Sequence, residues 1–294
     1  MEFIVPVTTD HLTARTSHLT PRDRDLLDKL GDHKVLSTSH VHHIWFASRR
    51  TAEMRLNELR ELDMVSKFTF ARQGGGVDEH MWTLGVLGHQ WQASRDKRAE
   101  PTRRAALAMI HQTEASRTLT HLLLVNEFFA RLAGHARRHP GASLERWWSD
   151  AKSTSAFRGV QPDGHALWSV EGEFAGLFLE ADTGTEPLTR VVAKLAAYRR
   201  LAANDSASYP VLFWLHSPKR EAHLQQQLRA ANVQVSVATA THDADPAGPV
   251  WLTSGSRDRV PFWQLPSNHG AAVAGNPNFR DGELDLPGRD PFHP

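Results

Sequence analysis

The spacing of apolar residues predicts three short helices in the first quarter of the chain. We expect a loose arm over residues 1–18, followed by a first helix that is capped by Thr20 and ends at Gly31. Threonine accepts hydrogen bonds at helix starts, and glycine adopts the left-handed conformation that often follows a helix. Apolar residues continue at helical spacing over residues 38–46 and 49–62, which predicts the second and third helices.

The third predicted helix has a polar face that is rich in arginine. Ser48 is a suitable cap, and Ala52, Leu56 and Leu59 recur on one side of the helix. The opposite side and its margins are therefore left to arginine and asparagine. Three short helices, the third of them basic, are typical of a helix-turn-helix.

Two alternating strands are predicted next, over residues 65–72 and 79–84, with glycines at 74–76 between them. A β-hairpin in this position predicts a winged helix-turn-helix domain over residues 19–98, with double-stranded DNA as its partner. The residues expected to contact DNA are Arg49, Arg50, Asn57, Arg60, Lys67 and Arg72. The alternative is a winged helix used for protein contacts, with the arginines as a solvated face.

A helical linker is expected over residues 99–140, after a further helix over residues 85–98. It ends in a long amphipathic helix that stops before Pro140 and Gly141. Three roles remain open for this helix: a spine between the domains, a part of the second domain, or the contact of a homodimer.

Apolar strands alternate with helices in the second half, which predicts an α/β domain over residues 141–256. The expected strands are 166–170, 174–181, 209–216, 233–239 and 250–252, and the expected helices are 186–203, capped by Thr185, and 219–231. Residues 257–294 are rich in Pro, Gly, Asn and Asp. We expect them to form an extended or disordered tail.

Composition limits the classes of function. Lys and Arg number 34 and Asp and Glu 33, so affinity for nucleic acid must come from local basic patches. The absence of cysteine excludes disulfides, thiolate zinc sites and cysteine nucleophiles. No apolar run is long enough to span a bilayer and no signal-peptide pattern is present, which predicts a cytoplasmic protein without a membrane partner.

Three carboxylates are predicted to meet at one end of the sheet in the second domain. Asp163 lies just before a strand, and Glu180 and Asp182 are two positions apart at the end of the next strand, so they point to the same side. Metal-dependent cleavage of a phosphodiester needs hard oxygen ligands for Mg²⁺ or Mn²⁺. The sequence therefore predicts that Asp163, Glu180 and Asp182 bind Mg²⁺ or Mn²⁺.

A catalytic cation is expected from Lys194. In a metal-dependent nuclease site of this kind, a lysine usually lies two positions after the acid. Here the acid is Glu180, and the second position after it holds Asp182. Lys194 lies on the following helix and shares a face with Arg190 and Tyr198, so it is predicted to reach the same site. The alternative is that Glu180 and Asp182 belong to a turn at the strand end and that Lys194 is an exposed helix residue.

Several segments together resemble one known family. PDG at 162–164, FLEADTGTEPL at 178–188 and KLAAY at 194–198 resemble the PD-(D/E)XK endonuclease-like fold in the form found in replication-relaxation proteins. LTPRDRDLL at 19–27, SRRTAEMRLNELRELDMV at 48–65 and HLLLVNEFF at 121–129 are similar to the same family. The resemblance thus extends over residues 19–240.

The resemblance implies a protein of plasmids or other mobile elements that acts in replication, relaxation or transfer. Its expected fold class is α/β (α+β overall), with a winged helix joined by helices to a mixed-sheet restriction-endonuclease-like domain that nicks or cleaves DNA. By analogy, Asp163, Glu180 and Asp182 match metal ligands, Lys194 matches the displaced lysine, and Glu145 matches an acid carried on an early helix. The alternative is a non-catalytic replication accessory or transcriptional regulator, which uses the nuclease-like domain for dimerisation or partner docking.

Other site hypotheses have less support. His40-Val41-His42 fits a tyrosine-relaxase pattern, but those histidines fall on a short helix, far in sequence from Tyr198 and Tyr209. The clustered histidines near position 40 do not converge as zinc ligands at their helical spacing. The tryptophans lie in or beside apolar strands, which predicts packing rather than base stacking.

Overall fold

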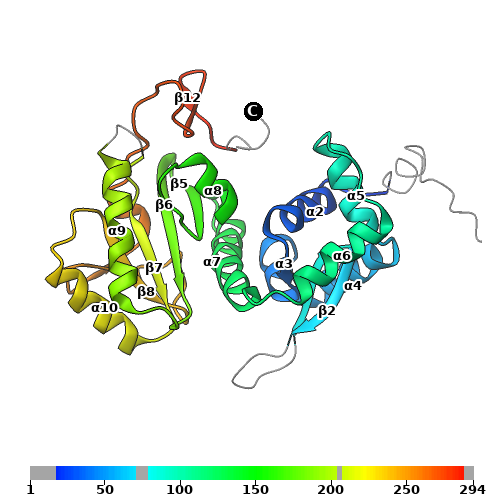
Figure 1. Ribbon diagram of the computed structural model, residues 1–294, viewed down its shortest axis with the longest axis horizontal. Coiled ribbons are helices and arrows are strands. Elements are labelled where there is room, and N and C mark those ends of the chain that lie inside the picture. The colour runs from blue at the N-terminus through cyan, green and yellow to red at the C-terminus, as the bar shows by residue number, and fades with distance from the viewer. Residues whose placement is uncertain (1–17, 71–78, 204–206, 288–294) are drawn as a thin grey trace, which may run out of the picture. The chain divides into compact units, whose positions relative to one another are not determined.

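The computed structural model describes residues 18–70, 79–203 and 207–287. Contacts divide the chain into two compact units, residues 1–126 and 127–294 (Figure 1). The division falls inside helix α7 (Leu119–Arg138), which belongs to the helical linker expected over residues 99–140. Within the described segments, no helix is long and apolar enough to cross a membrane.

The first unit has the element order predicted for a winged helix-turn-helix. Its elements are α2 (Pro21–His33), β1 (Leu36–Ser37), α3 (Thr38–Trp45), α4 (Arg49–Glu61), β2 (Val65–Phe70), β3 (Glu79–Leu84), α5 (Val86–Arg95) and α6 (Arg103–Glu114). The strands form an antiparallel sheet in the order β1-β3-β2. The hairpin β2–β3 thus directly follows α4, the third helix of this arrangement.

Helix α4 is built as its sequence predicts. The side chain of Ser48 accepts a hydrogen bond from the backbone N–H of Thr51 and so caps the helix. Ala52, Leu56 and Leu59 are fully buried. The arginine-bearing side of α4 therefore faces away from the core.

Helix α2 is longer than expected. It continues through Gly31 to His33, and Lys34, with a φ of 65°, ends it. Gly31 serves packing instead, because a Cβ there would lie 1.6 Å from the side-chain nitrogen of Gln92 on α5. The side chain of Gln92 thus occupies the space that a Cβ at position 31 would take, a contact that the sequence does not reveal.

The second unit is an α/β structure around one mixed sheet. Its elements are β4 (Ala142–Ser149), α8 (Asp150–Ala156), β5 (Gly164–Val170), β6 (Glu173–Asp182), α9 (Leu188–Ala202), β7 (Val211–Leu215), α10 (Pro218–Ala230), β8 (Val237–Thr241), β9 (Trp251–Thr253) and β10 (Arg259–Val260). The strand order is β10-β9-β8-β7-β6-β5-β4. Strands β6, β7 and β8 are parallel, and the other pairs are antiparallel.

The two faces of this sheet are covered by different helices. On one face, Phe128 of α7 meets Trp214 edge to face, and Phe129 of α7 stacks on Trp147. On the other face, α9 and α10 share a buried core with β6 and β7. Phe178 belongs to that second core, and alternate residues of a strand point to the same face, so Glu180 also points toward α9.

Glu145 lies on strand β4, not on an early helix as the resemblance implied. Its carboxylate accepts a hydrogen bond of 2.8 Å from the hydroxyl of Ser169 on β5. The pairing of β4 with β5 shifts register between Leu144 and Arg146. Glu145 is thus used inside the sheet and does not line the cavity described below.

The segment after residue 256 packs on the second unit as far as it is described. It contains η1 (Phe262–Gln264), β11 (Phe279–Arg280) and β12 (Glu283–Leu284). Arg146, which is 1% exposed, donates to the side-chain oxygen of Asn278 and to the carbonyl of Asp285. The expected tail is therefore irregular but anchored, because a buried guanidinium requires its acceptors.

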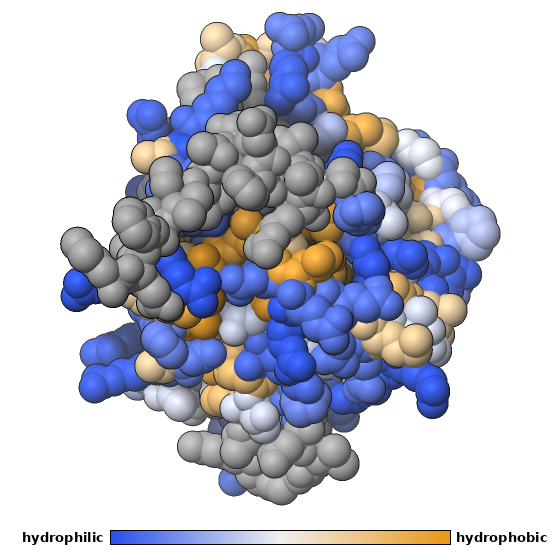
Figure 2. Space-filling view, turned by 90° about the vertical axis from the view of Figure 1, so that its right-hand side faces the viewer, coloured by the Kyte–Doolittle hydropathy of each residue, from blue (hydrophilic) through white to orange (hydrophobic). Residues whose placement is uncertain are grey.

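Figure 2 shows a face on which hydrophilic residues surround small apolar areas. Among the described residues, the exposed large apolar side chains are Met54, Leu107, Met109 and Val273. Isolated apolar residues of this kind are common on protein surfaces, so exposure alone does not indicate a function for any of them.

Candidate functional site

A cavity of about 860 Å³ opens in the second unit beside α8, α9 and the start of β5. The charged and phenolic side chains in its lining are Asp150, Asp163, Glu180, Lys194 and Tyr198. The strand–turn–helix unit expected from the sequence supplies most of them. The structure thus brings Asp163, Glu180 and Lys194 to one cavity.

Asp163 is held against strand β6 by two backbone contacts. Its N–H donates to the carbonyl of Leu179 at 3.0 Å, and its carboxylate accepts from the N–H of Ala181 at 2.8 Å. These bonds flank Glu180 on both sides. The two carboxylates are therefore positioned next to each other by the backbone of β6.

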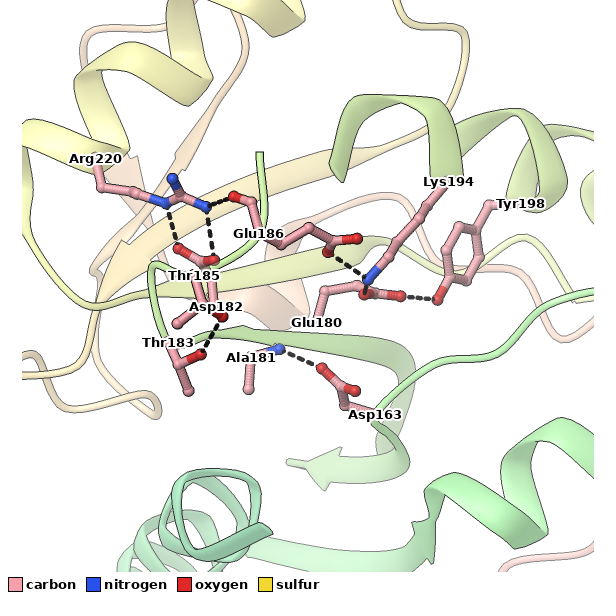
Figure 3. Close-up of polar contacts among 10 residues, drawn as sticks. All are labelled: Asp163, Glu180, Ala181, Asp182, Thr183, Thr185, Glu186, Lys194, Tyr198 and Arg220. Atoms are coloured by element: carbon pink, nitrogen blue, oxygen red, sulfur yellow. Dashed lines mark hydrogen bonds and ion pairs between the residues drawn. The ribbon is translucent and has the colours of Figure 1, made fainter. Parts of the chain in front are cut away.

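Glu180 is 3% exposed and is bonded to two residues of α9. Lys194 Nζ donates to Glu180 Oε2 at 3.0 Å, and the hydroxyl of Tyr198 donates to Glu180 Oε1 at 2.5 Å (Figure 3). Lys194 and Tyr198 are four positions apart and so lie on one face of the helix. The sequence predicts that these residues share a face, and in the structure this face of α9 points toward Glu180.

Burial is the largest single influence on the pKa values of Glu180, Lys194 and Tyr198 in this cavity. Burial raises the pKa of Glu180 to about 7, the nearby carboxylate of Asp163 acts in the same direction, and Lys194 opposes both. Burial opposes the charged form of Lys194, but the charge and hydrogen bond of Glu180 outweigh it and raise the Lys194 pKa. Burial, followed by the charge of Glu180, also raises the pKa of Tyr198. Tyr198 is therefore a hydrogen-bond donor at neutral pH.

Asp182 does not join this group, which corrects the expected set of three carboxylates. Arg220 of α10 donates to both oxygens of Asp182, at 2.6 and 2.9 Å (Figure 3). Asp182 points to the same side of β6 as Glu180, as predicted, but α9 covers one carboxylate and α10 the other. Asp182 is outside the lining of the cavity. Its charge is neutralised in a bidentate ion pair.

The turn between β6 and α9 connects the two carboxylate sites. Glu186 places its carboxylate 3.1 Å from Lys194 Nζ and its backbone carbonyl against Arg220. Pro187, not Thr185, is the N-cap of α9, and the hydroxyl of Thr185 lies 3.2 Å from that of Thr183. The turn thus contacts both Lys194, which binds Glu180, and Arg220, which binds Asp182.

Two carboxylates in the lining of the cavity, those of Asp163 and Glu180, are the residues that could hold Mg²⁺ or Mn²⁺. No group of three or more His, Cys, Asp or Glu side chains suited to a metal ion occurs among the residues that the structure describes. Mg²⁺, however, keeps several waters and often uses only one or two carboxylates. Asp163 and Glu180 offer that pair, and their mutual repulsion, part of what raises the Glu180 pKa, favours a cation between them.

The predicted DNA-contacting residues of the first unit differ in their availability. Arg49 lies 3.2 Å from Glu53 and 3.7 Å from Glu79, so its charge is already partly paired. Arg50 and Arg60 are exposed, and no carboxylate of the described chain pairs with either. Asn57 and Lys67 are half-buried, and Lys67 lies over the Trp82 ring. Arg72 falls outside the described residues.

The profile of the replication-relaxation family matches residues 27–211, which is more than half of the chain. The chain belongs to this family. Membership indicates a role in the replication or relaxation of plasmids or mobile elements. No curated protein and no solved structure matches the chain significantly.

Two residues of this replication-relaxation protein were not found from the sequence. Arg220 pairs with Asp182 across 38 positions, and nothing in the local pattern of either residue predicts that contact. Asp150 begins α8 and lines the cavity. Its position one residue beyond the segment Trp147-Trp148-Ser149 was the available signal, since strand ends carry site residues.

Proposed function

We propose that this replication-relaxation protein binds duplex DNA through its first unit and nicks one strand at the cavity of its second unit. The family supports a role at plasmid or mobile-element DNA. The proposal rests chiefly on one observation. Lys194 reaches from α9 to Glu180, beside Asp163, and so replaces the cation that strand β6 lacks.

The duplex would be held by α4 and the hairpin β2–β3. The exposed guanidinium groups of Arg50 and Arg60 suit phosphate or guanine, and Asn57 suits adenine. Lys67 lies on the first strand of the hairpin, where it suits a phosphate. Arg49 contributes less, because Glu79 and Glu53 already neutralise part of its charge.

The second unit would act on the phosphodiester. Asp163 and Glu180 would hold Mg²⁺ or Mn²⁺, and the bound ion would supply Lewis-acid stabilisation of the phosphate and lower the pKa of a bound water. Lys194, whose pKa is raised, remains protonated and stabilises negative charge that develops on the phosphate oxygens. Tyr198 donates to Oε1 of Glu180 and so orients that carboxylate. Asp182 and Arg220 hold the turn and take no part in the chemistry.

A plasmid-nicking assay tests the proposal. Full-length protein is incubated with supercoiled plasmid, including plasmid that carries a replication origin, in the presence and absence of Mn²⁺. Conversion to the open circle that depends on Mn²⁺ is expected. Duplex binding without nicking on any of these substrates contradicts the catalytic part.

The second candidate function is a non-catalytic replication accessory or regulator. It is favoured by the ion pair of Asp182 with Arg220, which leaves the expected third carboxylate unavailable to a metal ion. In that case the melting temperature does not respond to Mn²⁺, because no metal is bound. A rise in melting temperature with Mn²⁺ that is lost in Glu180→Gln decides against this candidate.

A further inference from the structure

Helix α4 presents one apolar side chain in the middle of its outward face. Met54 is 56% exposed. Arg50 lies four positions before it and Asn57 three positions after it, so the three residues form one stripe along the helix. The stripe lies opposite the buried residues Ala52 and Leu56.

Two neighbouring arginines of α4, Arg49 and Arg55, are held in ion pairs, whereas Arg50 in the stripe and Arg60 at its margin have none among the residues that the structure describes. Arg55 donates to Asp23 and Glu58, and Arg49 is paired with Glu79 and Glu53. Within the described chain, Arg50 has no such ion pair. The fold thus directs the flanking arginines into intramolecular bonds and leaves Arg50, Met54 and Asn57 to meet a partner.

The chemistry of the stripe matches base edges in the major groove. Arginine forms two hydrogen bonds with guanine and asparagine forms two with adenine, and an apolar side chain contacts the 5-methyl group of thymine. Met54 has a flexible, polarisable side chain that adapts to such a contact. In helix-turn-helix proteins the N-terminal residues of the recognition helix contact base edges, and Arg50 and Met54 lie in the first half of α4.

We propose that Met54 contacts a thymine 5-methyl group and makes this protein selective for that base. The inference rests on the proposed duplex binding by α4 and adds the residue that reads sequence through an apolar contact. Arg50 and Asn57 flank Met54 and read the neighbouring base pairs. The thymine therefore lies within the segment of the site that α4 covers.

The experiment uses full-length protein and DNA lacking single methyl groups. Preferred duplexes are first selected from a random pool with the wild-type protein. Each thymine of the selected site is then replaced in turn by deoxyuridine, which removes only the methyl group. At one position, wild-type protein and Met54→Leu are expected to bind about fourfold more weakly after replacement, whereas Met54→Ala binds both duplexes equally.

Met109→Ala is the matched control, because Met109 is also exposed but lies on α6. It is expected to show the wild-type response to deoxyuridine. If wild-type protein selects a site but Met54→Ala keeps the full response at every thymine, the role of Met54 is overturned while duplex binding stands. If wild-type protein selects no sequence, the proposed recognition by α4 fails and the role of Met54 fails with it.

Discussion

Lys194 on α9 donates a hydrogen bond to Glu180 on β6, with 3.0 Å between Nζ and Oε2. The second position after Glu180 holds Asp182, so strand β6 itself offers no cation to this cavity. The packing of α9 against the sheet supplies it instead. The same packing brings Tyr198 to the other oxygen of Glu180, so both oxygens are positioned by one helix.

Replacement of Lys194 is expected to slow nicking strongly. Among the described residues, Lys194 is the one lysine that lines the cavity, and Lys194→Ala should slow Mn²⁺-dependent nicking by about 100-fold or more. Arg190→Ala removes an exposed cation one turn earlier on α9 and is the control. Single-turnover nicking of supercoiled plasmid measures both. Equal nicking rates for the two variants would show that Lys194 is a surface residue of α9 without a role in catalysis.

The ion pair of Asp182 with Arg220 is expected to stabilise the second unit without serving a metal ion. Asp182→Asn or Arg220→Met each leaves a largely buried charge unpaired, which costs about 3 kcal/mol in the free energy of unfolding. The double variant should lose less than the sum of the two single variants. Chemical denaturation measures these values, and Lys219→Met serves as the exposed control on the same helix.

Asp182→Asn also separates the two interpretations of the carboxylates. Its melting temperature should still rise with Mn²⁺, because Asp163 and Glu180 remain in place. Loss of that response in Asp182→Asn, measured under conditions where the variant is folded, would restore Asp182 to the metal site.

Stability should fall as pH rises through the range in which Glu180 titrates. Its pKa is raised from 4.5 to about 7 by burial, with Asp163 adding to the effect. A raised carboxyl pKa stabilises the fold fully below about pH 4.5, and this contribution is lost as pH rises through about 7. Relative to Glu180→Gln, the wild-type free energy of unfolding should drop by about 3 kcal/mol across this window.

Urea denaturation at a series of pH values tests this dependence. Glu173→Gln changes an exposed carboxyl on the same strand and should follow the wild-type curve. If the difference in the free energy of unfolding between wild type and Glu180→Gln stays constant from pH 4.5 to 8, the pKa of Glu180 is not raised.

Arg50 and Arg49 should differ in their contribution to DNA binding. Arg50→Ala is expected to weaken duplex binding and to reduce the slope of log K against log salt by about 1, because one phosphate or base contact is lost. Arg49→Ala should change the slope less, since Glu79 and Glu53 compensate its charge. Binding titrations at several salt concentrations compare the two, and equal slopes would contradict the assignment.

Local patterns in the sequence were sufficient for most of the elements near these sites. The Ser48 cap and the buried face of α4 follow from spacing alone, and so does the placement of Glu180 at the end of a strand. The strand over residues 142–149 does not follow from its local pattern, because Trp147-Trp148 suits a helix as well as a strand.

The contacts that decide the chemistry could not be predicted from local pattern. Asp182 was assigned to the metal site because it shares a face with Glu180. Its partner, Arg220, lies after another strand and helix, and only the packing of α10 beside α9 brings it close. The pairing of Arg49 with Glu79 likewise depends on how the hairpin folds back on α3 and α4.

The most direct measurement is Mn²⁺-dependent nicking of supercoiled plasmid by wild-type protein and by Glu180→Gln and Asp163→Asn, with duplex binding measured in parallel. We predict that wild-type protein nicks the plasmid, that both variants lose nicking, and that all three bind duplex DNA with similar affinity. Nicking that survives in both variants, or its absence from wild-type protein that binds DNA, would contradict the assignment of this cavity as the catalytic site.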